Sequence, residues 1–522
     1  MNSLRRYHSA VWDEPLVMEM GAPGRRGILF PDPEPGILGV VGDSDSLLPD
    51  SMRRKAAANL PELSEPEVLR HYLHLSQETL GMMGISLFGT CTMKYNARVT
   101  EAMTRLPFVA ETHPNQDLET LQGTLEILHG LDEMLCELSG MDQFVFQSGG
   151  GADAAFLHAT VTRAYYEARG ELARRCEIIT TAQAHPCNPA TAAAAGFDVI
   201  TLPSEEDGYP SIEALRSVVS ERTAALMVNN PDDMGIYNPH IKEWVDIVHE
   251  VGGLCFYDHA NFNGVMGRIR AGELGFDACM FMLHKTFGAP KAGGGPAVGA
   301  YGCRESLAVH LTTPIVESSS DGFSIKVNNG DGKTQVREYL GNIPVVIKAY
   351  SWLLAMGAEG VKEAADLSML ANNYMETRLL QIPGVSKALP HIQQHRTEMT
   401  RYSLAELTED TGVTTVDVQN RMVDFGVDSY WLAHEPWLIP EPFTPEAGEM
   451  WSIEDMDYWI DVIAHICGEA RVSPEVVKTA PHNQAVHQID GSGLNDPERW
   501  ATTWRAHKRK SVNGGSVSSD RD

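Results

Sequence analysis

The segment Ala278-Cys279-Met280-Phe281-Met282-Leu283-His284-Lys285-Thr286-Phe287 places a lysine directly after a run of apolar residues. The apolar run 278–282 has the length and composition of a buried strand. Burying an ammonium group is costly, so a lysine at the end of such a strand favours a chemical role over a structural one. This strand and its lysine are the starting point for predicting both the fold and the site.

Similar short apolar, β-branched or aromatic runs precede and follow this segment, with helical stretches in most of the gaps between them. The expected strands are 144–146, 178–179, 199–202, 225–228, 254–257 and 297–301, and the expected helices include 152–169, 211–221 and 238–251. Strands that alternate with helices predict a mainly parallel sheet covered on both faces. Ligands of such sheets bind beyond the carboxyl ends of the strands, so functional residues are expected there.

The chain has 522 residues, too many for one ordinary core, and its composition divides it into four parts. A Pro- and Gly-rich arm with a helical segment occupies 1–110, and the large α/β domain occupies 111–325. A polar, turn-rich stretch marks the boundary to a smaller α+β domain, 326–485, in which a long helix is expected at about 343–380. The last part, 486–522, is a tail whose Ser-, Gly- and charge-rich end is typical of disorder.

The formal net charge of −29 argues against a nucleic-acid partner. No segment approaches the roughly 20 consecutive apolar residues of a membrane helix. The first twenty residues contain Glu14 and Glu19 and lack the apolar core of a secretory signal. The eight cysteines form no CxxC pair and are expected to be reduced thiols. These features predict a cytoplasmic protein that acts on a small molecule.

Three further segments carry polar or glycine residues at predicted strand ends. Gln147-Ser148-Gly149-Gly150-Gly151-Ala152 enters a helix and is a candidate phosphate cup, although a flexible strand-to-helix turn has the same composition. His185 suits stacking on an aromatic cofactor or acid–base work, but a lone histidine is more often structural. Asp258 ends an apolar strand, where a carboxylate serves as a cofactor partner or as a helix cap.

Together with Lys285, these groups meet the requirements of pyridoxal 5'-phosphate (PLP). That cofactor needs a lysine for its Schiff base, an acid that keeps the pyridine nitrogen protonated, and a phosphate site. A flat group against the ring, here His185, is the usual fourth element. The four elements occur in order at the ends of predicted strands, which predicts a PLP enzyme with Lys285 as its Schiff-base residue.

Through segments such as Gly89 to Asn96, His185 to Ala190 and His284 to Phe287, the sequence resembles the P-protein of the glycine cleavage system, and more narrowly its second subunit in organisms where the protein is split in two. The resemblance covers about residues 20–485. The segments that carry it are Pro23 to Gly27, Leu63 to Val68, Gly89 to Asn96, His185 to Ala190, Asp258 to Asn261, His284 to Phe287 with the glycine run after it, and Met356 to Gly360. Cys91-Thr92-Met93-Lys94 and His284-Lys285-Thr286-Phe287 are far more specific than a lone glycine loop.

That family has the fold type I PLP architecture, so the resemblance implies a large α/β domain with a mainly parallel sheet and a smaller α+β C-terminal domain. Carried over residue by residue, it makes Lys285 the Schiff-base lysine and Asp258 the partner of the pyridine nitrogen. His185 is implied to stack on the ring, with Ala260 on its other face. The remaining implied cofactor-binding residues are His284 and the backbone around Gly150, Gly151 and Ala152 for the phosphate, and Asn261 near the phenolic oxygen. No metal site is expected.

In that family, glycine loses carbon dioxide and its aminomethyl group passes to the lipoyl arm of the H-protein. The resemblance therefore implies an amino-acid substrate, a first P-protein subunit and a lipoylated H-protein as partners, and a homodimer or an α2β2 assembly. Two alternatives stay open. One is a related PLP decarboxylase, lyase or transferase that acts on another amino acid or amine. The other is a non-catalytic partner subunit, against which the presence of both Lys285 and Asp258 argues.

Several positions depart from the family pattern. Gly151-Ala152-Asp153-Ala154-Ala155 stands where the family has Gly-Ala-His-Gly-Glu, and Met399-Thr400-Arg401-Tyr402 replaces a Met-His-Glu-Phe-like strand. The others are Pro186-Cys187 in place of Gly-Thr, His259 in place of Gly, and Asn115 in place of Tyr. We expect these positions around the pocket, so they bear on how the substrate and the lipoyl arm are handled.

Overall fold

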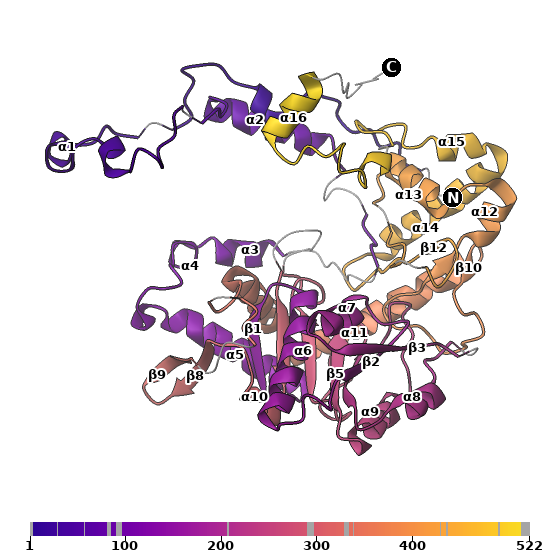
Figure 1. Cartoon of the computed structure of the whole chain (residues 1–522). Helices are drawn as coiled ribbons and strands as arrows, with labels where there is room; N and C mark the ends of the chain where they lie inside the picture. Colours follow the sequence, from indigo (N-terminus) through magenta and orange to yellow (C-terminus); the bar gives the residue numbers. More distant parts are fainter. Residues whose placement is uncertain are drawn as a thin grey trace. The chain divides into compact units, whose positions relative to one another are not determined.

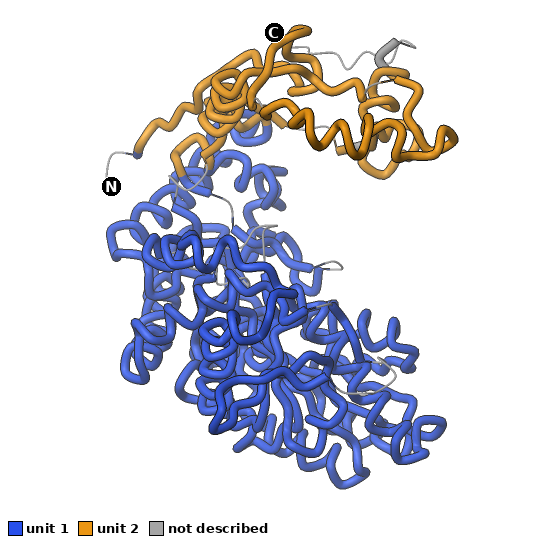
Figure 2. The backbone as a smooth tube through the Cα atoms, turned by 90° about the vertical axis from the view of Figure 1, so that its left-hand side faces the viewer, with its two compact units in different colours: residues 1–4, 85–422, 427–478 blue, residues 5–84, 423–426, 479–522 orange. Residues whose placement is uncertain are grey.

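The chain forms two compact units in a computed structural model, shown in different colours in Figure 2. Unit 1 comprises residues 1–4, 85–422 and 427–478, and unit 2 comprises 5–84, 423–426 and 479–522. The residues that the structure describes are 4–28, 30–56, 58–80, 85–89, 97–205, 208–289, 297–327, 334–337, 339–428, 430–434, 437–488 and 491–512. The motif Cys91-Thr92-Met93-Lys94 and the glycine run 293–295 lie outside them.

A seven-stranded sheet with the strand order β1-β7-β6-β5-β4-β2-β3 forms the centre of unit 1 (Figure 1). Its strands are β1 (Gln143–Ser148), β2 (Glu177–Thr181), β3 (Asp198–Leu202), β4 (Thr223–Asn229), β5 (Leu254–His259), β6 (Ala278–Met282) and β7 (Gly299–Cys303). Strand β7 runs antiparallel to both of its neighbours, and the other six strands run in one direction. The expected mainly parallel sheet is confirmed, and six carboxyl ends meet at one edge.

Helices cover both faces of this sheet, because the side chains of each buried strand point alternately to the two sides. In β5, Phe256 belongs to the core on one face and Tyr257 to the core on the other. The helices that pack on the sheet are α5 (Gln122–Ser139), α6 (Gly151–Ala168), α7 (Cys187–Ala194), α8 (Ile212–Val218), α9 (Ile241–Glu250) and the first part of α11 (Ile343–Leu379). In α5 one apolar face is buried, with leucines at 125, 128, 131 and 135 in the core.

A smaller α+β region follows the long helix α11, which changes direction at Gly357, where φ is 61° and ψ is −179°. Three short antiparallel strands form its sheet: β10 (Ser386–Lys387), β11 (Tyr402–Ser403) and β12 (Pro442–Phe443). The helices around it are α12 (Ala405–Thr411), α13 (Thr415–Met422), α14 (Ile453–Val472) and α15 (Pro474–Lys478). The remaining elements of unit 1 are α3 (Arg98–Thr104), α4 (Pro107–Ala110), η4 (Leu118–Thr120), α10 (Glu305–Ala308) and the hairpin β8 (Ile315–Ser319) and β9 (Gly322–Lys326).

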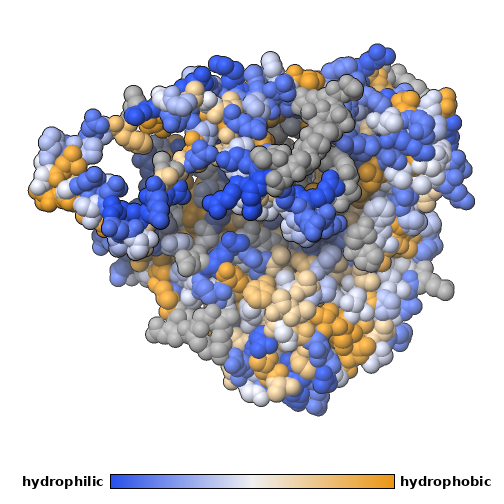
Figure 3. Space-filling view, turned by 45° about the horizontal axis from the view of Figure 1, so that its top comes forward, coloured by the Kyte–Doolittle hydropathy of each residue, from blue (hydrophilic) through white to orange (hydrophobic). Residues whose placement is uncertain are grey.

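Unit 2 contains the N-terminal arm and the last part of the chain. Its elements are η1 (Val17–Glu19), α1 (Pro35–Val41), η2 (Ser44–Leu47), α2 (Glu65–Gln77), η5 (Val423–Phe425), η6 (Gly491–Gly493) and α16 (Trp504–Val512). Helix α2 begins with a capping box in which the Glu67 side chain accepts a hydrogen bond from the Ser64 backbone at 2.9 Å. Helix α1 buries no residue, and apolar residues lie on the surface of this part of the arm (Figure 3).

Two further expectations concern membranes and disulfides. Within the described parts of the chain, no helix is long and apolar enough to cross a membrane. The seven cysteines that the structure describes are all free thiols. Three of them, Cys255, Cys279 and Cys303, are buried in the strands of the central sheet.

Gly235 lies in the loop after β4 with a φ of +76°, where an added Cβ would lie only 1.8 Å from the Met399 carbonyl oxygen. Both the positive φ and the clash oppose a side chain here, so we expect Gly235→Ala to lower the free energy of unfolding by about 3 kcal/mol. Chemical denaturation of the two proteins measures the difference. Gly170→Ala is the matched control, because Gly170 also has a positive φ (+71°) but no atom within 4 Å of the added Cβ. Equal losses in the two variants would contradict the steric argument.

Candidate active site

Three sequence-predicted residues, Lys285, Asp258 and His185, lie near one another at one edge of the central sheet. Asn229, Asp258 and Met280 stand opposite one another on the adjacent strands β4, β5 and β6. Lys285 lies in the turn just beyond β6, where its backbone N–H donates to the Met282 carbonyl at 3.0 Å. The charge of Lys285 acts on both Asp258 and His185. The structure therefore brings the lysine, the acid and the histidine together at the carboxyl edge of the sheet.

Asp258 is buried, with 1% of its surface exposed. One carboxylate oxygen accepts from the Ala260 backbone N–H at 2.9 Å, and the other accepts from the Asn188 side-chain amide at 3.2 Å. Burial raises the pKa of Asp258 to about 6, while the nearby charge of Lys285 acts in the opposite direction. A buried carboxylate held in this way is suited to pair with one further cation, such as a protonated ring nitrogen.

The imidazole of His185 is held in one orientation as a neutral ring. Its backbone N–H donates to the Asn229 side chain at 2.9 Å, and its Nδ1 accepts from the Cys187 backbone N–H at 3.1 Å. Burial lowers the pKa of His185 to about 4, so the proton of the neutral ring is assigned to Nε2. A flat, uncharged ring beside the acid and the lysine suits stacking on an aromatic group.

Asn261 and Ala260 follow directly after β5 and are both buried. The Asn261 amide nitrogen donates to an Asp233 carboxylate oxygen at 3.0 Å, which fixes the direction of the side chain. Its Oδ1 atom has no hydrogen-bond partner among the residues described. Ala260 offers only a methyl group, which is compatible with a flat ring lying against it.

The expected phosphate cup lies between the end of β1 and the first turn of α6. Helix α6 begins at Gly151 with Gly150 as its N-cap, so its first backbone N–H groups are free for an anion. A Cβ at Gly151 would lie 3.0 Å from the Met282 sulfur, which places the cup beside the end of β6. Ala152 is exposed in the same turn. The cup and the Lys285 turn are therefore neighbours.

The departure Asp153 also lies in this first turn, where a carboxylate would repel a phosphate. Its Oδ2 atom accepts from the Gly149 backbone N–H at 3.0 Å and from Arg337 Nε at 2.7 Å. A Cβ at Gly149 would lie 2.5 Å from the Arg337 guanidinium. Arg337 thus neutralises the carboxylate of Asp153 beside the cup.

A PLP group fits the donors and acceptors at this edge of the sheet. Burial lowers the pKa of His284 to about 4, so its imidazole is neutral. Several buried polar atoms have no hydrogen-bond partner in the described structure, and such atoms are rare unless a ligand or water satisfies them. At the ends of β1, β5 and β6 they include Ser148 Oγ, Asn261 Oδ1, His284 Nδ1 and Thr286 Oγ1. These groups match the phosphate and the phenolic oxygen of the cofactor.

The other departures divide into core, surface and pocket positions. His259 packs in an aromatic core, with its ring 3.8 Å from that of Tyr257 and 5.2 Å from that of Phe281, and burial lowers its pKa to about 3. Asn115 is exposed in the segment before η4. Pro186 and Arg401 line one cavity beside His185.

Four residues that sequence analysis did not single out complete the site. Asn188 and Asn229 hold Asp258 and His185, and Asn188 also donates to Asn229 at 3.0 Å. Asp233 orients Asn261, and the ring of His434 packs edge-on against that of His185 at 4.5 Å. The sequence could have indicated Asn229, since an apolar run stops there as it does at Asp258. It contains no pattern that indicates His434, because tertiary packing of the C-terminal region brings this residue to the site.

Comparison with known proteins extends these observations. Residues 133–434 match the model of the family Aminotransferase class-V. The crystal structure of a glycine decarboxylase (P-protein) of the glycine cleavage system, in inhibitor-bound form, superposes with a TM-score of 0.71. It covers 84% of this chain and all of that one at 19% identity, so it supports the fold alone. A cysteine desulfurase from Escherichia coli gives a TM-score of 0.57 at 18% identity over 74% of this chain and 95% of that one. The expected fold type I architecture is confirmed.

Two curated relatives match nearly the whole chain. One from Pyrococcus horikoshii is 39% identical over 97% of this chain and 99% of its own length. One from Caldanaerobacter subterraneus subsp. tengcongensis is 38% identical over 95% and 99%. Both are named probable glycine dehydrogenase (decarboxylating) subunit 2. With this identity over almost all of both chains, the protein belongs to the family of glycine dehydrogenase (decarboxylating) subunit 2.

Proposed function

We propose that this protein is a PLP-dependent enzyme that decarboxylates glycine and passes the aminomethyl group to the lipoyl arm of an H-protein. The observation that carries the proposal is the group of Lys285, His185 and the buried Asp258 at the carboxyl edge of the sheet, in a chain 39% identical to proteins named for this activity. Both residues that a non-catalytic subunit has no need of, the lysine and the acid, are present and close together.

When bound, PLP supplies the electron sink that makes loss of carbon dioxide from an amino acid feasible. Lys285 would hold the cofactor through Nζ, and Asp258 would keep a proton on its ring nitrogen. His185 and Ala260 would hold the ring between them. Asn188 and Asn229 act indirectly, because their hydrogen bonds keep Asp258 and His185 in place. His284, Gly150, Gly151 and Ala152 would bind the phosphate, and Asn261 would bind the phenolic oxygen.

The partners and the compartment belong to the same proposal. The relatives are named as second subunits, which supports a first subunit as partner. The assembly we propose is a homodimer or an α2β2 heterotetramer. The exposed apolar residues of the arm, among them Ile37 and Val40, are available for such an interface. The free thiols and the net charge of −29 support a cytoplasmic location.

Exchange of the glycine carboxyl group with labelled bicarbonate tests the activity directly. We expect label to enter glycine only when the protein is combined with PLP, a lipoylated H-protein and a first subunit from the same organism. The control is H-protein without its lipoyl group, which should support no exchange above background. Absence of exchange in the complete mixture, with a first subunit shown to bind this chain, would contradict the proposal.

A further inference from the structure

Beside the PLP-binding residues, unit 1 contains a cavity of about 300 Å³. Ala184 and Pro186 on either side of His185 form part of its wall, and Arg401, Asp233 and His434 contribute the charged and titratable groups. The edge-on contact of His434 with the His185 ring and the hydrogen bond between Asp233 and Asn261 join this wall to the cofactor-binding residues. Two residues of the cavity wall, His434 and Asp233, are therefore in contact with cofactor-binding residues.

Arg401 is the buried cation of this wall, and both of its hydrogen bonds go to neutral groups. Only 5% of its surface is exposed. Nε donates to the Thr444 hydroxyl at 3.0 Å, and one terminal nitrogen donates to the backbone carbonyl of Asp233 at 2.8 Å. No ion pair of its guanidinium is found among the residues described, although the nearby carboxylates of Asp233 and Asp232 act on its charge. These carboxylates offset part of the cost of burying the charge, and an anion in the cavity would offset more of it.

The other arginines of unit 1 that are buried in the described structure, Arg175 and Arg396, have more partners than Arg401. Arg396 donates to four backbone carbonyls, and Arg175 donates to the Thr223 carbonyl at 2.8 Å and lies 3.8 Å from a carboxylate oxygen of Glu171. Two half-buried arginines also have structural contacts. Arg421 forms an ion pair with Glu469, with Nε 2.9 Å from a carboxylate oxygen. Arg304 donates to the backbone carbonyls of Gly140 and Gly272, and joins two loops at the opposite side of the sheet from the active-site edge. Neither residue lines the cavity. The two contacts of Arg401 fix its direction and leave guanidinium N–H groups for a ligand.

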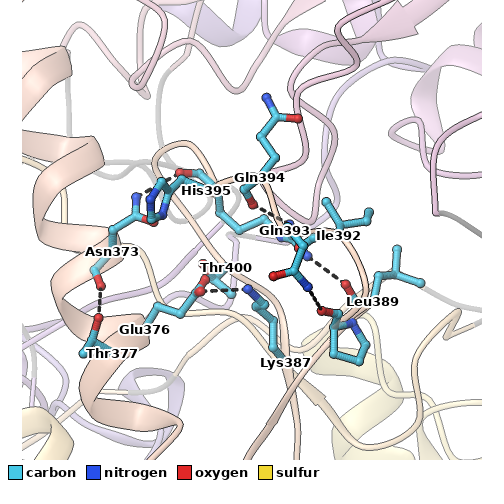
Figure 4. A network of polar contacts seen from close by, with 12 residues as sticks. Asn373, Glu376, Thr377, Lys387, Leu389, Ile392, Gln393, Gln394, His395 and Thr400 are labelled. Atoms are coloured by element: carbon cyan, nitrogen blue, oxygen red, sulfur yellow. Dashed lines mark hydrogen bonds and ion pairs between the residues drawn. The ribbon is translucent and has the colours of Figure 1, made fainter.

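The backbone that carries Arg401 is held firmly, so its guanidinium is positioned in advance. The preceding residue, Thr400, donates to Glu376 of α11 at 3.0 Å, and the other oxygen of Glu376 pairs with Lys387 at 2.8 Å (Figure 4). Asn372 of the same helix donates to the Thr400 hydroxyl at 3.1 Å and to the Thr397 carbonyl at 3.0 Å. A preorganised guanidinium loses little entropy when it binds a planar anion.

The neighbours of Arg401 define which anion fits. The carboxylate of Asp233 lies in the same wall, with one oxygen held by Asn261 and the other 3.6 Å from His434 Nε2. This negative charge disfavours a ligand of high negative charge and favours one that also carries an ammonium group. A guanidinium beside a carboxylate, across one cavity, complements a zwitterion.

We propose that Arg401 is a specificity-determining residue that binds a carboxylate of the amino-acid substrate in this cavity. The inference rests on the proposed function only in that the substrate is an amino acid. The carboxylate has two sources that share this chemistry: the α-carboxylate of a glycine-sized substrate, or the side-chain carboxylate of a larger one. The family resemblance implies a glutamate at this position, and this chain has Arg401 there.

The test measures binding to the PLP-loaded full chain through the change in the visible absorption of the bound cofactor. The probes are glycine, glycinamide and aspartate, titrated into wild type, Arg401→Gln and Arg401→Lys. We expect Arg401→Gln to weaken binding of the carboxylate-bearing probe by about 10- to 100-fold, the range for a hydrogen bond to a charged group. Binding of glycinamide should change less than about twofold, because the amide carries no charge to lose.

The arms of the experiment distinguish the two sources. If the loss affects glycine, the α-carboxylate occupies the cavity; if it affects aspartate alone, the side-chain carboxylate does. Arg401→Lys keeps the positive charge but not the planar guanidinium, so it should lose less affinity for the carboxylate-bearing probe than Arg401→Gln. Arg304→Gln is the matched control, since it removes a partly buried arginine away from the cavity and should leave all three affinities unchanged.

A measurement on wild type alone guards against variants that fail to fold. Acetate and succinate should compete with the amino acid that responds to Arg401, and methylammonium should not compete at the same concentrations. Unchanged affinities in both Arg401 variants, or no competition by either carboxylate, would overturn the proposal. Because these measurements need neither a first subunit nor an H-protein, they stand apart from the bicarbonate exchange that tests the proposed function.

Discussion

Replacement of Lys285 by alanine should abolish the visible absorption band that wild type shows after addition of PLP. Among the described residues at the carboxyl edge of β6, Lys285 carries the amine that can bind the cofactor covalently, and its charge acts on both Asp258 and His185. We expect turnover to fall by about 10³-fold or more, in the range that loss of a covalent nucleophile costs. Absorption spectra and the bicarbonate exchange assay measure the two effects.

The control for this change is Lys242→Ala, on the exposed face of α9. Lys242 pairs with Asp246 at 3.1 Å on the surface, and an exposed pair of this kind contributes little to stability. This variant should keep both the band and the activity. Lys285→Ala should unfold at the same denaturant concentration as wild type when PLP is left out. A Lys285→Ala protein that retains the visible band would show that another amine holds the cofactor.

Replacement of Asp258 by asparagine should leave PLP bound and remove most of the activity. The carboxylate stabilises a proton on the ring nitrogen, and a neutral pyridine withdraws electrons poorly. We expect kcat to fall by about 10²- to 10³-fold, as when one preorganised electrostatic contact is removed from an active site. The visible band should persist, because Lys285 is unchanged. Near-normal turnover in this variant would refute the role of Asp258.

The stability of the same variant provides a second measurement. Burial raises the pKa of Asp258 to about 6 in the folded protein, against 3.8 for the group without this environment. A carboxyl group with a raised pKa favours the folded state below pH 4 and loses that contribution as the pH rises towards 6. Without PLP, the asparagine variant should therefore be at least as stable as wild type at pH 7. A large loss of stability there would show that the ionised carboxylate holds the fold together.

Local patterns in the sequence were sufficient for much of the fold. The apolar runs that end at Asp258 and Lys285 predicted strands β5 and β6, because a buried strand in a parallel sheet must be apolar on both faces. The order of the strands in space is a different matter. The position of antiparallel β7 between β1 and β6 depends on contacts between segments far apart in the chain. No periodicity in any one segment encodes it.

The site shows the same division. The sequence by itself determined that a lysine, an acid, a histidine and a glycine cup follow apolar strands, since chemical groups at strand ends are visible in the order of residues. Only the tertiary structure decided which departures matter. In that structure His259 packs in an aromatic core, whereas Arg401 and Asp233 lie in one cavity wall beside His185. The physical reason is that the direction of a side chain depends on the packing of elements distant in the chain, which a local pattern does not contain.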